Sequence, residues 1–298
     1  MSVTRISSDK FVYVMDKKNP AVLTVRPGAR LVFETKDAYD GQIESEDQDV
    51  KGVDLDTVCP STGPVAVEGA VPGDAIKVYI EKIENAGPGI IVSLPGLGIF
   101  AEDIKRSTII MADVKKDGIT FANGIKLPWR PMIGVLGTAP KDEPIPCGFQ
   151  DNHGGNMDCM RITEGCTVYL PVFHPGGMLS IGDVHGCQGD GEINGTAVEM
   201  SANVHVTVDL VKGMNITDPM LETDDMLYSL VSDETMEKAT KRASKNIRDL
   251  TSKKINLDDE LTNMLCSLVG SLEICQIVDP KVTVRFGMPK WVLDKGSK

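Results

Sequence analysis

Hydrophobic and polar residues alternate along several short stretches in the first third of the chain. In AIKVYIEKI (75–83), every second residue is apolar from Ile76 to Ile80. This alternation indicates a strand with one buried and one wetter face. Pro-Gly turns at 26–29 and 71–74 separate two pairs of such stretches, AVLTV from RLVFET and PVAVEG from AIKVYIEKI. The pattern therefore predicts two β-hairpins.

The middle of the chain has a weaker pattern. Residues 84–149 are dense in Gly and Pro and carry only short apolar runs, which predicts short strands and long loops. The longest alternation runs from Ala197 to Leu210. It places valines and other apolar residues on one face and polar residues, among them Glu199, on the other. We expect one long strand there, covered on one side.

Apolar residues recur at helical spacing nearer the C-terminus, where two amphipathic helices are predicted, one after a cap at Asp233 and one after Asn256. A last strand is expected around Val282 to Phe286. The whole suggests one α/β, β-rich domain over 1–298. Its expected parts are a β-rich part (1–220), a helical part (225–275) and a final strand (281–287).

Composition narrows the function classes. The 298 residues are 41% hydrophobic, enough for a substantial core. With 31 basic and 43 acidic residues the net charge is −12, which would repel phosphate backbones and anionic lipids. We therefore expect neither a nucleic-acid nor a membrane partner. Seven cysteines without C-x-x-C spacing, and an N-terminus without signal-peptide features, suggest a cytoplasmic protein with reduced thiols.

Polar residues suited to chemistry are concentrated in two Gly-rich stretches, 151–158 and 182–199. Asp183 and His185 are two apart, so on an extended backbone both side chains leave the same face, as ligands of one metal must. Asp190 and Glu192 repeat this spacing. Such groups suit zinc or a related divalent ion. A solvated turn carrying a surface histidine is the simpler alternative.

Other features of these stretches are less specific. The run from Asp190 resembles an EF-hand loop at its start, but its twelfth position is Ser201 rather than Glu, so we reject that reading. The first stretch offers Asn152, His153, Asn156 and Asp158, which alone could be an ordinary turn. The acidic loop 37–49 is more simply a solvated loop than a calcium site. Cys187 is an alternative nucleophile, although a small buried thiol is the simpler reading.

The motifs HGGNMD (153–158) and GDVHGCQGDGE (182–192) resemble those of the acetamidase/formamidase family. The segments DGQIES (40–45), GPVAVEGAVPGDAIKVYI (63–80) and QIVDPKVTV (276–284) are also similar to family patterns, so the resemblance covers most of the chain. It implies a layered α/β/α/β sandwich with mixed sheets, a divalent metal, a homodimer, and hydrolysis of formamide, acetamide or a similarly short amide. Two departures are the Gly186-Cys187 pair, where small residues such as Ala are expected, and His153, which we do not expect to be an essential ligand.

From the matched motifs we assign roles to nine residues. The predicted metal ligands are Asp158, Asp183, His185 and Asp190, with zinc as the first choice of ion and calcium as the alternative. Glu192 is the predicted general base, which takes a proton from water and passes it to the departing nitrogen. Around the amide we expect Asn156, Gly155, Gln188 and Gly189.

The leading hypothesis is therefore metal-dependent hydrolysis of a short aliphatic amide to its carboxylic acid and ammonia. Two alternatives stay open. One is a metal-stabilised protein that binds a small ligand without catalysis, and the other is a hydrolase of a different C–N bond. Ammonia release from formamide would distinguish the first alternative, and a panel of amides the second.

Overall fold

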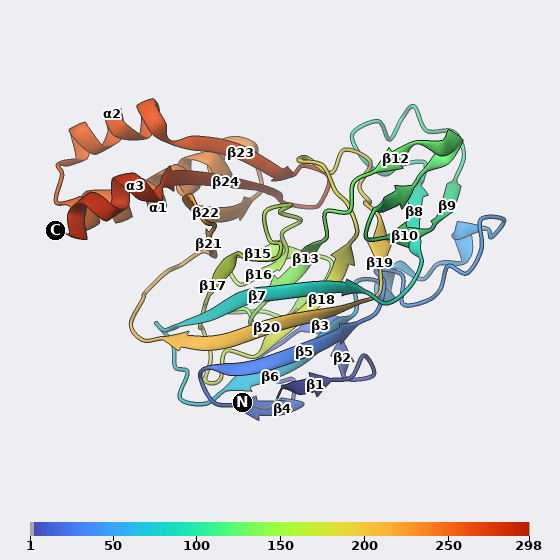
Figure 1. Ribbon diagram of the computed structural model, residues 1–298, viewed down its shortest axis with the longest axis horizontal. Helices are drawn as coiled ribbons and strands as arrows, with labels where there is room; N and C mark the ends of the chain where they lie inside the picture. Colours follow the sequence, from blue (N-terminus) through green and yellow to red (C-terminus); the bar gives the residue numbers. More distant parts are fainter. Residues whose placement is uncertain (1–2, 298) are drawn as a thin grey trace.

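The computed structural model describes residues 3–297 and contains two large sheets (Figure 1). The nine-stranded sheet has the order β1 (Thr4–Ile6), β5 (Ala29–Thr35), β20 (Ala202–Val211), β7 (Ala75–Asn85), β17 (Thr167–Pro171), β21 (Met220–Glu222), β22 (Met226–Asp233), β24 (Val282–Pro289) and β23 (Ser271–Gln276). Its strands are antiparallel except β1 and β5, which run parallel. The sheet is therefore mixed, as predicted.

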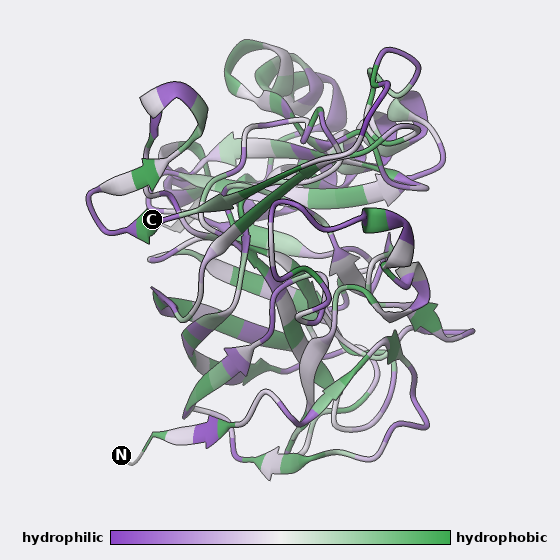
Figure 2. Cartoon of the chain, turned by 90° about the vertical axis from the view of Figure 1, so that its right-hand side faces the viewer, coloured by the Kyte–Doolittle hydropathy of each residue, from purple (hydrophilic) through white to green (hydrophobic). Residues whose placement is uncertain are grey.

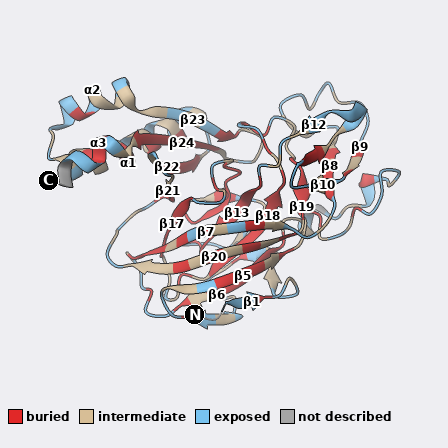
Figure 3. Cartoon of the chain, in the orientation of Figure 1, coloured by how far each residue is buried: buried red, intermediate tan, exposed pale blue. Residues whose placement is uncertain are grey.

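The ten-stranded sheet carries four of the candidate site residues, Gly155, Asn156, Asp183 and His185. Its main path is β15 (Gln150–Asp151), β16 (Gly154–Asn156), β13 (Met132–Gly137), β18 (Leu179–His185), β19 (Glu199–Met200), β8 (Gly89–Ser93) and β9 (Thr108–Ala112). From β18 it branches to β6 (Ser61–Val67), which also pairs with β2 (Phe11–Val12) and β4 (Leu23–Val25). Figure 3 shows β13 and β18 as buried strands at the centre of the molecule.

Smaller elements lie at the periphery. A three-stranded sheet joins β10 (Val114–Lys115), β11 (Gly118–Thr120) and β12 (Lys126–Leu127), and β3 (Val14–Met15) pairs with β14 (Ile145–Pro146). Between residues 84 and 149 the chain forms short strands and loops without an α-helix, as predicted. Figure 2 shows hydrophobic residues concentrated along the strands and hydrophilic residues in many of the peripheral loops.

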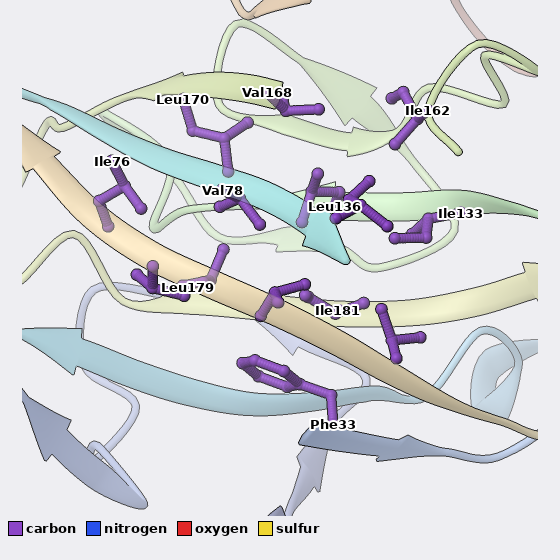
Figure 4. Close-up of a cluster of buried hydrophobic side chains, with 14 of the residues drawn as sticks. Phe33, Ile76, Val78, Ile133, Leu136, Ile162, Val168, Leu170, Leu179 and Ile181 are labelled. Carbon is purple, nitrogen blue, oxygen red and sulfur yellow. The ribbon is translucent and has the colours of Figure 1, made fainter. Parts of the chain in front are cut away.

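The main core lies between the two large sheets (Figure 4). Ile76, Val78 and Ile80 on β7 are fully buried. They belong to the same apolar cluster as Ile133 of β13 and Ile181 of β18, from the other sheet. The predicted alternation of β7 is confirmed, because Tyr79 on its other face is 41% exposed.

Both predicted hairpins are wrong in their pairing, although their strands exist. β4 pairs with β6 and β5 pairs with β1 and β20, so the turn at 26–29 leads from one sheet to the other. Likewise β6 pairs with β18, whereas β7 pairs with β20 and β17. Period-2 alternation shows which face of a strand is buried but not which strand lies beside it.

Three helices complete the described chain, α1 (Met236–Ile255), α2 (Asp259–Val269) and α3 (Lys290–Leu293). Two amphipathic helices near the C-terminus are confirmed, but their caps differ from the prediction. The Thr235 hydroxyl caps α1 and the Asp258 carboxylate caps α2, whereas Asn256 ends α1 in the left-handed conformation. No helix within residues 3–297 combines the length and apolar character needed to cross a bilayer.

The predicted boundaries of the C-terminal parts also change. Residues 226–233, expected in the helical part, form β22, and β23 occupies 271–276. The helices pack on β22 and β24 through an apolar cluster that includes Ala239, Ala243 and Ile247. The helices thus lie together at one end of the nine-stranded sheet (Figure 1), and an α/β/α/β succession of layers is not confirmed.

Candidate metal centre

Five buried titratable side chains converge at the end of β18 and form what we call the five-residue cluster, namely Asp158, Asp183, His185, Glu192 and Glu199. Ligand atoms of Asp158, Asp183 and His185 lie within 4.8 Å of one another, and so do those of His185, Glu192 and Glu199. His185 is shared by both groups. The two Gly-rich stretches of the sequence are therefore brought together as predicted.

The distances around the imidazole are short. His185 Nε2 lies 2.9 Å from Glu199 Oε2 and 3.3 Å from Asp183 Oδ1, and its Nδ1 is 3.9 Å from Asp158 Oδ1. The Nε2 atom and these facing oxygens nevertheless have no partner with hydrogen-bond geometry. Both Oδ atoms of Asp158 are buried without a partner too. The unpartnered atoms thus face a common space instead of each other's hydrogens.

Gln188 orients the imidazole. Its Oε1 accepts a hydrogen bond from His185 Nδ1 at 2.8 Å, while its Nε2 donates to the carbonyl of Asp158 at 2.8 Å. Because Nδ1 then carries the proton, the lone pair of the neutral ring lies on Nε2, on the side of the carboxylates. Both ends of the Gln188 amide are engaged, so this side chain fixes the ring of His185. Gln188 also lines the open cavity, and its predicted contact with substrate stays a prediction.

Gly134 of β13 makes room for two of the acids. A Cβ at this position would lie 2.6 Å from Asp158 Oδ1 and 2.6 Å from Asp183 Oδ2. Residues on either side of Gly134 pair with β18 on one edge, and Val135 pairs with Asn156 of β16 on the other. The strand β13 therefore lies between the two Gly-rich stretches and pairs with a strand from each. Its Gly134 leaves room for the carboxylates of Asp158 and Asp183.

The cluster concentrates negative charge away from water. Burial is the largest cause that raises the pKa of Asp158, Glu192 and Glu199, and neighbouring carboxylates add to it. For His185, burial lowers the pKa, but the charges of Glu199 and Asp183 outweigh it and raise the pKa. Four acids beside one imidazole are costly to bury without a compensating cation.

These residues fit a divalent metal. Carboxylate oxygens and a neutral imidazole nitrogen are ligands for zinc and related ions. Asp158, Asp183, His185 and Glu199 supply the buried, unpartnered atoms. Glu192 differs from them, because it lines an open cavity as well as belonging to the cluster.

Asp190, a predicted ligand, does not join the cluster. Its Oδ1 and Oδ2 accept hydrogen bonds from Arg285 at 2.8 and 2.7 Å, and its side chain is 40% exposed. The expectation that Asp190 and Glu192 leave the same face is wrong, because Glu192 has φ of 45° and the backbone there is not extended. Asp190 lies in the loop that follows β18. Its ion pair with Arg285 connects this loop to strand β24.

Three other predicted residues lie around the cluster. Gly155 pairs with Leu136 and Gln150 inside the sheet, whereas Gly189 lines the open cavity. Asn156 donates from Nδ2 to Asp279 at 3.1 Å, and its Oδ1 is buried without a partner. His153 is buried outside the cluster, where burial lowers its pKa to about 4.

Sequence reasoning missed two acids near this centre. Glu199 was placed on the wetter face of one long strand, but the strand is divided after Met200, and Glu199 pairs with His185. The position of Glu199 at the end of the second polar stretch was the one feature of the sequence that could have indicated its role. Asp279 stands in the QIVDP segment, and burial, followed by the charge of Asp183, raises its pKa to about 7.

Comparison with known proteins agrees with this architecture. The chain is 30% identical over 260 residues to an acetamidase of Mycolicibacterium smegmatis, covering 65% of this chain and 64% of that protein. It spans less than two thirds of the length of the curated relatives it matches.

Solved structures match over nearly the whole chain. A predicted acetamidase/formamidase from Thermoanaerobacter tengcongensis superposes with a TM-score of 0.96 at 37% identity, covering 99% of this chain and 98% of that one. An acetamidase from Bacillus halodurans gives a TM-score of 0.96 at 37% identity, with 99% and 100% covered. The model of the Acetamidase/Formamidase family matches residues 15–147 and 145–246. Together with the shared fold, this match shows that the chain belongs to the acetamidase/formamidase family.

Proposed function

We propose that this protein hydrolyses a carboxamide to its carboxylic acid and ammonia, with a divalent metal ion held by Asp158, Asp183, His185 and Glu199. The observation that carries the proposal is the set of buried ligand atoms without partners. Membership of the family and the names of its acetamidase and formamidase relatives support amide cleavage. Zinc is our first choice of ion, because an imidazole is among the ligands.

When bound, such an ion supplies Lewis-acid polarisation of an amide carbonyl and a lower pKa for water. Glu192 is the base in our proposal, since it alone of the five lines the open cavity. It accepts a proton from the attacking water and passes it to the amide nitrogen as the C–N bond breaks. Burial, the largest cause that raises the pKa of Glu192, favours its acting as acid in the second transfer.

Asn156 would hold the substrate amide group. Its Nδ2 donates one of its two hydrogens to Asp279, and its carbonyl oxygen Oδ1, an acceptor, is buried without a partner, so we assign Oδ1 to the substrate. An acceptor suits the N–H groups of a carboxamide better than a developing oxyanion. This refines the role predicted from the sequence, in which either the oxyanion or the amide was a possible partner.

The test compares Glu192→Gln with His185→Ala. We expect Glu192→Gln to retain metal by elemental analysis and to lose at least 100-fold in kcat for ammonia release, a typical size for loss of a general base. His185→Ala should lose both metal and activity. Full activity in Glu192→Gln would refute the base assignment.

A chelator provides the complementary test, because activity should fall on metal removal and return on adding back one divalent ion. Activity that survives metal removal and is abolished by Cys187→Ala would instead support a thiol amidase. Metal binding without ammonia release from any amide would support the ligand-binding alternative.

We also propose a homodimer formed through the C-terminal elements. Leu261, Met264 and Leu268 lie on one face of α2 and are 48%, 59% and 79% exposed. The adjoining strand β23 is the edge of the nine-stranded sheet and exposes Leu272 and Ile274. An apolar surface beside a free sheet edge favours association with a second chain.

A further inference from the structure

A cavity of about 590 Å³ opens beside the five-residue cluster. Glu192, Gln188 and Gly189 contribute to its lining, so it reaches the proposed base. Acetamide carries a single methyl group and would leave nearly all of this space to water. The volume lies in the range of sites that hold considerably larger ligands.

One wall of the cavity is a face of the β8–β9 ribbon, which lies on the right of Figure 1. Ile91 is paired with Ile110, and Ser93 with Thr108, and all four residues line the cavity. The other face of the ribbon carries Ile90, Val92 and Ile109, which are buried in an apolar cluster. The alternation along these strands thus divides them between a core face and a cavity face.

The remaining walls are mostly apolar. Phe121 and Leu127, from either side of the turn before β12, contribute to them, as do Ile193 and Val198 from the loop after β18. No lysine, arginine or histidine is among the described residues that line the cavity, and the carboxylate of Asp190 is paired with Arg285. Such walls favour a neutral, apolar group.

We propose that this cavity receives the apolar chain of a larger primary amide, of about five to eight carbons, with the carboxamide directed to Glu192. This inference rests on the proposed function and names its substrate class. Water adds its hydroxyl to the acyl carbon, the C–N bond breaks, and the two protons of water end on ammonia and the carboxylic acid. The chain in the cavity takes no part in the bond changes and supplies binding energy only.

The first measurement is kcat/KM for ammonia release along a series from acetamide to hexanamide, with metal-loaded protein. Burial of each methylene should raise kcat/KM about fourfold until the chain fills the cavity. Calorimetric titration of the metal-loaded Glu192→Gln variant with hexanamide and acetamide measures binding with little interference from turnover. Hexanamide should bind more tightly.

Two variants test whether the apolar chain of the amide binds in this cavity. Ile110 and Phe121 line the cavity but belong to none of the buried apolar clusters. In Ile110→Asp the hexanamide-to-acetamide ratio of kcat/KM should fall at least tenfold, and Phe121→Ala should lower it in the same direction. The matched control is Ile125→Asp, since Ile125 is 54% exposed and does not line the cavity. Its ratio should equal that of the unmodified protein.

The outcomes separate this inference from the proposed function. Equal kcat/KM for acetamide and hexanamide, or a ratio unchanged in both cavity variants, would overturn the cavity assignment and leave amide hydrolysis standing. If no amide is hydrolysed, the proposed function fails and calorimetry decides: hexanamide binding that Ile110→Asp or Phe121→Ala weakens upholds the cavity assignment. Absence of hexanamide binding overturns it.

Discussion

Three acidic residues of the cluster have left-handed backbone conformations. Asp158, Asp183 and Glu192 have φ values of 44°, 49° and 45°. Such values are uncommon for residues other than glycine and are concentrated at functional sites. The sequence argument for Asp183 and His185 assumed an extended backbone. The prediction that Asp183 and His185 lie close together is correct. The reason given for it is incomplete, because the backbone at Asp183 is left-handed and not extended.

At the residue scale, the sequence predicted part of the cluster. Asp183 and His185 stood out by their spacing between glycines, and Asp158 was added by the resemblance of its motif to the family. Glu199 did not, because alternation assigned it to a solvent face. Neither spacing nor alternation in the sequence indicates the break after Met200 that separates β19 from β20. The pairing of β19 with β18 places Glu199 beside His185.

Gly134→Ala should reduce metal binding while preserving the fold. The added methyl group would lie 2.6 Å from an oxygen of each of Asp158 and Asp183, so these carboxylates must move. We expect at least a tenfold loss of metal affinity, in line with disturbed ligand positions. Competition with a chromogenic chelator measures it. Gly52→Ala is the matched control, because nothing lies within 4 Å of its added Cβ, and equal affinities in the two variants would contradict the prediction.

Asp279→Asn should weaken substrate capture. Asp279 fixes the orientation of the Asn156 side-chain amide by accepting a hydrogen bond from its Nδ2. With an asparagine at position 279, the Asn156 amide could rotate by half a turn and exchange its oxygen and nitrogen positions. We expect kcat/KM to fall about tenfold, the worth of one hydrogen bond, with metal content unchanged. Steady-state ammonia release and elemental analysis check both points. A variant that lost metal would show that Asp279 acts on the ligands instead.

At the scale of elements, the sequence predicted where strands occur better than how they pair. β4, β5, β6 and β7 all exist, yet each Pro-Gly turn joins strands of different sheets. A Pro-Gly turn between two apolar strands looks the same in the sequence whether it closes a hairpin or leads from one sheet to the other. Local turn chemistry could not decide between them.

The crossing from β6 to β7 is held by Asp74. Its carboxylate accepts hydrogen bonds from the N–H groups of Val71 at 3.0 Å and Gly213 at 2.9 Å, and from Lys212 Nζ at 2.6 Å. The hydrogen bond from Lys212 is the largest cause that lowers the pKa of Asp74 below its ordinary value of 3.8. The ionised carboxylate therefore stabilises the native turn.

Asp74→Asn should lower the free energy of unfolding at pH 7 by about 1–2 kcal/mol. Because the folded pKa is depressed, this stabilisation is complete above the unfolded pKa and is lost as the pH falls through the folded value. The difference between the two proteins should therefore shrink below about pH 4. Urea denaturation at a series of pH values measures it. A difference independent of pH would contradict the electrostatic explanation.

At the scale of the whole molecule, the C-terminal helices and strands form an end region that presents apolar side chains outward. Leu268 is the most exposed of them at 79%. In Figure 1, α2 lies at the upper left, and Figure 3 shows exposed positions along it. The sequence indicated amphipathic helices but not that part of the apolar stripe of α2 faces outward.

Leu268→Glu should convert the proposed dimer to a monomer. The charge would be placed within the apolar contact, whereas in the isolated chain the same side chain would remain in water at little cost. Light scattering coupled to size exclusion gives the mass directly. Ile125→Glu, a change at another exposed isoleucine, is the control. An unmodified protein of monomeric mass at micromolar concentration would contradict the proposed dimer.

The switching of consecutive strands between sheets has a consequence for how the chain folds. The pairing of β5 with β20 joins segments some 170 residues apart in the sequence, and the pairing of β6 with β18 is also long-range. While the first half of the chain is being made, β5 can pair only with β1, and β6 only with β2 and β4. The longer pairings of both strands, with β20 and β18, are still missing at that stage. We expect refolding on the slow side for a protein of this length, with early intermediates prone to aggregate.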